Sequence, residues 1–189
     1  GSFIFRFYRI SGLIGALTQQ CVVDLGDRHF VLGDGDCYVH DGQSSTSVID
    51  KRNRDILFNL IDADNYTNCF VRHHEKRNEV WVCYPFNEQV FPNKVFIWNY
   101  VDDTWTQRDL DTNTASMDYG IIADAAYTWV TIPYPTWNDW RVPWGARQYS
   151  PLNDSLVSVT TDTEMFKWED GNQDNGVDIT CTLEKTNLE

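Results

Sequence analysis

The sequence predicts a fold of the all-β class. Aromatic residues make up 14% of the 189 residues, and aromatic side chains favour the half-buried, pleated surfaces of β-sheets. Short runs of alternating apolar residues are separated by turns rich in Gly and Asp, which is typical of antiparallel hairpins. One strand–turn–strand pattern also occurs three times, as in propeller blades or solenoid coils. We therefore expect antiparallel meander blades of a β-propeller, partial or completed by other copies, with one short connecting helix.

The three copies of this pattern share two ring-bearing positions. Corresponding residues are Tyr38, Phe96 and Phe166, followed two positions later by His40, Trp98 and Trp168. A spacing of two keeps both side chains on one face of a strand. The copies lie farther apart than the roughly 40–50 residues of standard propeller repeats, and the excess falls in polar connections. We expect a single propeller-like domain or fragment over residues 1–189, with blade-like units at about 20–50, 65–110 and 119–185.

The first unit is expected to be a four-stranded meander. Alternating apolar residues predict strands at residues 21–25, 29–32 and 37–40, joined by tight turns that contain Gly and Asp. Residues 47–49 are expected to close the unit as its outer strand.

Residues 50–62 are the best candidate for a helix. Asp50 is suited to the N-cap, because its carboxylate can accept hydrogen bonds from the first free amide groups of a helix. Apolar residues then recur with helical spacing at Ile56, Leu57, Leu60 and Ile61. We expect a connector of about three turns that docks on a blade.

The second unit is the clearest of the three. Residues 69–73, 79–84, 95–100 and 105–110 predict four strands, which make up one complete propeller blade. Trp81 lies in a nearly continuous apolar run, and such runs indicate strands that are buried on both faces. We expect Trp81 and Trp98 to be core residues.

The third unit is looser. Strands are expected at residues 119–126, 129–132, 155–159, 165–168 and 177–183, with a long connection over residues 133–153. Propellers have four to eight blades, so three blades are too few to close a ring. Either the chain is a fragment of a propeller, or partners complete the ring.

Composition excludes some classes of function. The net charge is −13, which argues against a free-standing nucleic-acid-binding protein, because phosphate contacts need clustered Lys and Arg. Acidity of this kind favours solubility or docking to a basic partner. We expect no signal peptide and no membrane-spanning run of about 20 residues.

The cysteines favour a structural role. All five lie in apolar, strand-like runs and none forms a CxxC pair: Cys21, Cys37, Cys69, Cys83 and Cys181. We interpret them as small buried thiols in a reducing compartment.

Candidate catalytic and metal-binding motifs are weak. Residues 102–105 resemble half of the Asp-box turn of sialidase-like propellers, but the Ser and Gly of that motif are absent. His73 and His74 are adjacent on a strand, so they point to opposite faces and do not readily share one ion; a solvated strand end is expected instead. Calcium ligands are an alternative role for two groups of Asp residues, Asp34, Asp36 and Asp41, and Asp170, Asp174 and Asp178. The first group lacks the EF-hand pattern, and Asp–Gly pairs serve turns, so turn geometry is the expected role. We predict no catalytic residues, no metal and no cofactor.

The segment of residues 133–147 has the most unusual composition of the chain, with many Trp and Pro residues. Part of it is expected to face the core. Because Trp and Arg dominate interface hot spots, the candidate interface residues are Trp137, Trp140, Arg141, Trp144 and Arg147. Stacked Trp rings would also suit a sugar, so glycan binding remains open.

Four segments carry a resemblance to a known family. They are residues 32–42 (LGDGDCYVHDG), 79–85 (EVWVCYP), 93–99 (NKVFIWN) and 102–105 (DDTW). In these four motifs the chain resembles β-propeller structural proteins of tailed bacteriophages. This family is related to the packaged-DNA stabilisation or tail-accessory proteins at the head–tail junction. Residues 168–184 also resemble a later strand of the family that opens a further blade, so the resemblance extends over most of residues 20–185.

The resemblance implies a non-enzymatic component of the phage particle, located at the head–tail junction or tail and assembled in the host cytoplasm. Its expected partners are other virion proteins, such as portal or tail components, and copies of itself. It implies no sequence-specific contact with nucleic acid and no membrane contact. The alternative is a propeller-type binding module that recognises a host glycan or protein.

Overall fold

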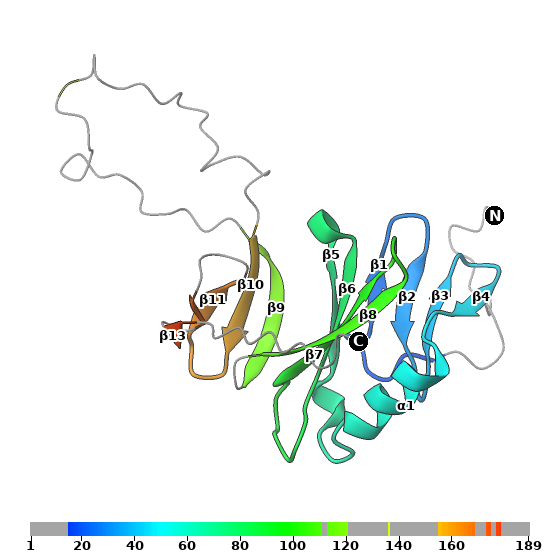
Figure 1. Cartoon of the computed structure of the whole chain (residues 1–189), viewed down its shortest axis with the longest axis horizontal. Helices are drawn as coiled ribbons and strands as arrows, with labels where there is room; N and C mark the ends of the chain where they lie inside the picture. Colours follow the sequence, from blue (N-terminus) through cyan, green and yellow to red (C-terminus); the bar gives the residue numbers. More distant parts are fainter. Residues whose placement is uncertain are drawn as a thin grey trace, which may run out of the picture. The chain divides into compact units, whose positions relative to one another are not determined.

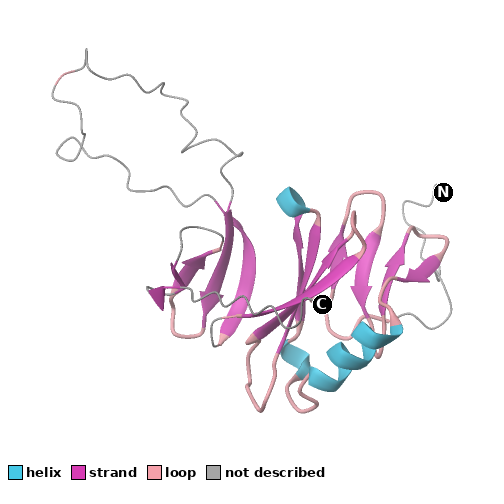
Figure 2. Ribbon diagram, in the orientation of Figure 1, coloured by secondary structure: helices cyan, strands magenta, loops and turns pink. Residues whose placement is uncertain are grey.

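The computed structural model describes residues 15–110, 113–120, 136 and 155–168, together with the backbone of residues 173–174 and 177–178. These residues are mostly β-strand with one α-helix (Figures 1 and 2), so the predicted all-β class is confirmed. The chain divides into two compact units, residues 1–118 with 159–164 and residues 119–158 with 165–189. Each unit is described by itself below.

The first sheet, called sheet A, is an antiparallel meander with the strand order β1-β2-β3-β4. Its strands are β1 (Val22–Asp24), β2 (His29–Leu32), β3 (Cys37–His40) and β4 (Ser45–Ser47). Gly26 and Gly42 have φ angles of 96° and 88°, which only glycine adopts readily. They make the tight turns that the sequence predicts.

The fourth strand of sheet A was predicted two residues too late. The Asp41 carboxylate accepts hydrogen bonds from the backbone N–H groups of Gln43 and Ser44 at 2.9 and 2.8 Å. This turn brings the chain back at once, so that β4 pairs with β3 from Ser45 onward. Ile49, which we expected inside the strand, follows it and is buried in the core.

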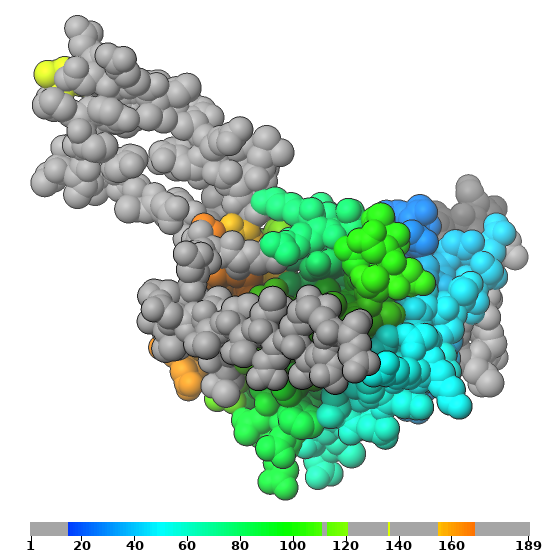
Figure 3. Space-filling view, in the orientation of Figure 1, coloured from blue at the N-terminus to red at the C-terminus, as the bar shows by residue number. Residues whose placement is uncertain are grey.

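The predicted helix is present as α1 (Lys51–Leu60). Asp50 is its N-cap, and its side chain accepts hydrogen bonds from the backbone N–H groups of Arg52 and Asn53 at 2.9 and 3.1 Å. Of the expected apolar stripe only Leu57 is fully buried, whereas Ile56 is exposed. The helix lies near one end of the strands of the two sheets of this unit (Figure 1), and part of the helix reaches the molecular surface (Figure 3).

The second sheet, called sheet B, follows a short 3₁₀ turn, η1 (Tyr66–Asn68). It has the order β5-β6-β7-β8 and is antiparallel throughout. Its strands are β5 (Phe70–His74), β6 (Glu79–Tyr84), β7 (Lys94–Asn99) and β8 (Thr104–Asp109), with the turn η2 (Glu75–Arg77) between the first two. The predicted four-stranded unit is confirmed, and Trp81 and Trp98 are both buried.

A third sheet has the order β11-β10-β9. Its strands are β9 (Thr114–Gly120), β10 (Ser155–Thr160) and β11 (Met165–Lys167), and a two-stranded ribbon of β12 (Gln173–Asp174) and β13 (Val177–Asp178) follows. The strand expected to begin at residue 119 therefore begins at Thr114. The strand expected at residues 129–132 and most of that at 177–183 lie outside the described residues.

Sheets A and B share one hydrophobic core. Its buried members come from both sheets, from α1 and from the connections between them: Cys21, Phe30, Leu32, Cys37, Val39, Ile49, Leu57, Cys69, Val71, Val80, Val82, Tyr84, Phe96 and Trp98. The first strands of the two sheets approach each other, since the N–H of Val71 donates to the carbonyl of Gln20 at 2.8 Å.

The two sheets have the same register. In sheet A, Tyr38 pairs with Val31 and Ser47. In sheet B, Phe96 pairs with Val82 and Gln107. Tyr38 and Phe96 therefore hold equivalent positions, as their places in the sequence repeat predict, and so do His40 and Trp98.

Candidate protein–protein interface

The interface residues predicted from composition are not among those that the structure describes. Trp137, Trp140, Arg141, Trp144 and Arg147 lie outside the described residues, and of the segment 133–147 only position 136 is described. Their role as an interface stays a prediction. The described residues instead show how this chain packs one sheet against another.

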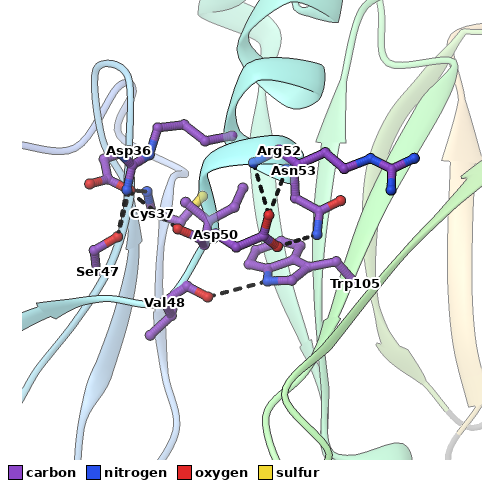
Figure 4. Close-up of polar contacts among 10 residues, drawn as sticks. Asp36, Cys37, Ser47, Val48, Asp50, Arg52, Asn53 and Trp105 are labelled. Atoms are coloured by element: carbon purple, nitrogen blue, oxygen red, sulfur yellow. Dashed lines mark hydrogen bonds and ion pairs between the residues drawn. The ribbon is translucent and has the colours of Figure 1, made fainter.

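Aromatic side chains form the contact between sheets A and B. Phe30 of β2 lies against Trp98 of β7, with ring centroids 5.6 Å apart. Trp98 stacks on Trp105 of β8 at 6.0 Å with an interplanar angle of 21°. The Trp105 indole Nε1–H donates to the carbonyl of Val48, just after β4, at 3.2 Å (Figure 4). Aromatic burial and one directed hydrogen bond thus join the sheets.

The faces that meet are not equivalent faces. On sheet B the contact uses the face that carries Val82, Phe96 and Trp98. On sheet A it uses the face that carries Phe30 and Val39, which is opposite to the face of Tyr38 and His40 because side chains alternate along a strand. By register, the counterparts of Phe30 and Val39 are Trp81 and Ile97. Each sheet therefore offers a different face to its neighbour.

The second face of sheet B is buried as well. Its central residues are Phe70, Trp81, Cys83, Val95 and Ile97, all nearly inaccessible. The guanidinium of Arg72, on the same face, donates to the carbonyl of Met117 in β9. The prediction that the apolar run around Trp81 is buried on both faces is confirmed.

Sheet A differs because its second face is only partly covered: Val31 is buried there, whereas His29 is exposed. Val22 is 42% exposed, although Val71, its counterpart in sheet B, is fully buried. On the same face, the rings of His29 and His40 stack with centroids 5.1 Å apart. His29 Nε2 lies 3.9 Å from an oxygen of Asp24. We call the face that carries Val22, Val31, Tyr38, His29 and His40 the outer face of sheet A.

A polar cluster holds the end of sheet A against the start of α1. The Asp36 carboxylate accepts hydrogen bonds from the backbone of Cys37 at 2.8 Å and from the Ser47 hydroxyl at 2.9 Å (Figure 4). Arg54 of α1 pairs with the same carboxylate at 3.1 Å. This confirms that Asp36 serves the local geometry, and Asp41 does the same in its turn.

The two adjacent histidines point to opposite faces, as predicted. His73 Nε2 lies 3.0 Å from the hydroxyl of Tyr100, and desolvation lowers the pKa of His73. His74 is buried beside the ring of Trp81, at 5.9 Å between centroids. The expectation of a solvated strand end is therefore wrong for His74, because the second face of sheet B is covered.

The other candidate motifs can be located among the described residues. Within the described ranges, no three His, Cys, Asp or Glu side chains are grouped to hold a metal ion. Asp103, in the segment that resembles half an Asp-box, accepts a hydrogen bond from the Trp98 indole at 3.0 Å.

Among the described residues, no helix is long and apolar enough to cross a membrane.

The described cysteines are buried free thiols, as predicted: Cys21, Cys37, Cys69 and Cys83. Desolvation by burial raises the pKa of each, that of Cys69 to about 12. A thiol with a raised pKa forms little thiolate and is a poor nucleophile. Cys181 lies outside the described residues.

The outer face of sheet A is the site that reasoning from sequence missed. Its signal was present in the repeat, because Tyr38 and His40 match Phe96 and Trp98, which are interface residues of sheet B. The sequence does not show which face of each sheet packs against the neighbouring sheet, so the repeat alone could not identify this face as a candidate site. No protein-family model and no curated protein sequence matches the chain.

Proposed function

We propose that this chain is a non-enzymatic structural component of a tailed phage particle, with its sheets arranged as blades of a β-propeller. The observation that carries the proposal is the packing of sheets A and B. Two sheets of equal register meet through unlike faces, with Phe30 against Trp98. In a propeller, each blade packs on the next in this head-to-tail manner, whereas a two-fold arrangement brings like faces together.

The residues that carry the resemblance to phage proteins support the same proposal. Residues 79–84 form β6 and residues 94–99 form β7, while residues 102–103 lie in the turn before β8 and residues 104–105 begin that strand. Within them, Trp98 and Asp103 are joined by a hydrogen bond, and Trp98 contacts sheet A. The motifs that resemble phage proteins therefore lie in strands of sheet B and include a residue that packs against sheet A.

The particle itself supplies the test. Antibodies raised against the recombinant chain are applied, with gold labels, to phage particles whose genome encodes it. We expect label at the head–tail junction or along the tail, and none after the antibodies are absorbed with the chain. Particles without label, in which mass spectrometry also detects no peptide of the chain, would contradict the proposal. Binding of the free chain to host polysaccharide together with that result would favour the glycan-binding alternative.

A further inference from the structure

A histidine lies where the first strands of sheets A and B approach each other. His73 in β5 pairs with Val80 in β6, so its side chain is on the face of sheet B that packs against sheet A. The side chain is half-buried. Two positions earlier on the same strand, the N–H of Val71 donates to the carbonyl of Gln20 at 2.8 Å. His73 therefore lies beside a backbone hydrogen bond that joins the two sheets.

Both ring nitrogens of His73 have a hydrogen-bond partner. Nε2 lies 3.0 Å from the hydroxyl of Tyr100, which follows β7. Because Nε2 faces this hydroxyl, the hydrogen bond of the ring with the backbone of Asp24 in β1 uses Nδ1. In a neutral imidazole one nitrogen donates and the other accepts. Nδ1–H thus donates to Asp24 of sheet A, while Nε2 accepts from Tyr100 of sheet B.

Protonation of the ring changes this arrangement. An imidazolium donates from both nitrogens and accepts at neither, so the Tyr100 hydroxyl can no longer donate to His73. The hydroxyl has another acceptor within reach, because Oδ1 of Asn78 lies 3.1 Å away. The bond that Tyr100 donates to β5 is then replaced by one to the residue before β6.

The groups around His73 determine which form of the ring the folded chain favours. Desolvation is the largest effect, and it lowers the pKa of His73 from the ordinary value of 6.5. The charge of the neighbouring His74 acts in the same direction, whereas the carboxylates of Glu75 and Asp24 oppose the shift. Arg28 carries a further positive charge near the hydroxyl that faces the ring. The contact between the sheets therefore accommodates the neutral ring better than the cation.

We propose that His73 is an acid-sensitive joint between sheets A and B, which holds β1 against β5 as a neutral ring and loosens this contact when the ring is protonated. A histidine whose pKa is lower in the folded chain than in the unfolded chain stabilises the fold above the unfolded value. For His73 this stabilisation is complete above pH 6.5 and is lost as the pH falls through the lower folded pKa. The proposal uses only contacts within the first unit and does not depend on the propeller arrangement.

Hydrogen exchange measured by NMR tests the joint at the amide beside it. The N–H of Val71 bridges the two sheets, so its protection factor is expected to fall about threefold or more between pH 7.5 and pH 5.5. The fall should be absent in His73→Gln, whose side chain stays neutral and can form hydrogen bonds at both pH values. The matched control is His29→Gln, because His29 is exposed on the outer face of sheet A. This variant should lose protection at Val71 as the unchanged chain does.

Titration of the ring gives a second readout that needs no variant. The Cε1–H resonance of His73, assigned from the backbone of the isotope-labelled chain, is expected to titrate with a midpoint below pH 6.5. A midpoint at or above pH 6.5 would overturn the inference. A Val71 protection factor that stays constant with pH, or that falls equally in His73→Gln, would do the same.

Discussion

Trp98 contributes both to the core between the two sheets and to the turn before β8. Its ring fills the core between the sheets against Phe30, while its indole N–H is satisfied by Asp103 in the turn before β8. Buried Trp side chains are usually paired in this way. The repeat in the sequence identified this residue correctly, because an aromatic residue within an alternating apolar run indicates a core position.

The buried thiols give a prediction at the scale of single residues. In the native chain Cys21, Cys37, Cys69 and Cys83 are expected to resist alkylation by iodoacetamide at pH 8, because their raised pKa values leave little thiolate. The measurement is mass spectrometry of peptides after a short pulse of reagent. The same pulse in denaturant, as a control, should modify all four. Rapid modification of any of them in the native chain would show that it is neither buried nor inert.

Helix α1 is an element whose start depends on one side chain. Hydrogen bonds from the backbone of Asn53 and from its side chain, together with the backbone of Arg52, hold the pKa of Asp50 below its ordinary value, although desolvation opposes the shift. A lowered pKa in the folded state means that the carboxylate stabilises the fold above the ordinary Asp pKa of 3.8. That stabilisation is lost as the pH falls through the lower folded value.

Replacement of Asp50 tests how much the N-cap stabilises helix α1. Asp50→Ala is expected to lower the melting temperature at pH 7, because two backbone amide groups lose their acceptor. The difference from the unchanged chain should begin to shrink below pH 3.8, the ordinary Asp pKa, and should vanish as the pH falls through the lower pKa of the folded state. The matched control is Asp50→Asn, which keeps an acceptor and should retain most of the stability without this pH dependence. An Asp50→Ala deficit that is equal at pH 7 and pH 3 would contradict a role for the charge.

The elements also show which parts of the fold were predictable. The strands of sheet B and helix α1 were found because apolar spacing and a cap residue mark them locally. Strand β9 was missed at its start because only Met117 and Thr114 are buried among its polar residues. The start of β4 depends on the Asp41 turn. The burial of each residue on the outer face of sheet A depends on what packs against that face, and the pattern of one strand does not carry that information.

For the whole molecule, the account depends on the rule that unlike faces meet. The rule accounts for the burial of Phe96 and Trp98, whereas their counterparts Tyr38 and His40 are only half-buried. It also distinguishes a series of blades from a sandwich of two equivalent faces. In such a sandwich Phe30 would lie against Trp81, its own counterpart. In a series of blades it lies against Trp98.

The most direct test of this rule is a pair of double-mutant cycles, measured by urea unfolding. One cycle combines Phe30→Leu with Trp98→Leu, and the other combines Phe30→Leu with Trp81→Leu. The account predicts a coupling of about 0.5–1.5 kcal/mol for Phe30 with Trp98, as expected for a direct aromatic pair. It predicts additive effects within about 0.5 kcal/mol for Phe30 with Trp81. Coupling of Phe30 to Trp81 and additivity with Trp98 would contradict the packing of unlike faces, and with it the propeller arrangement.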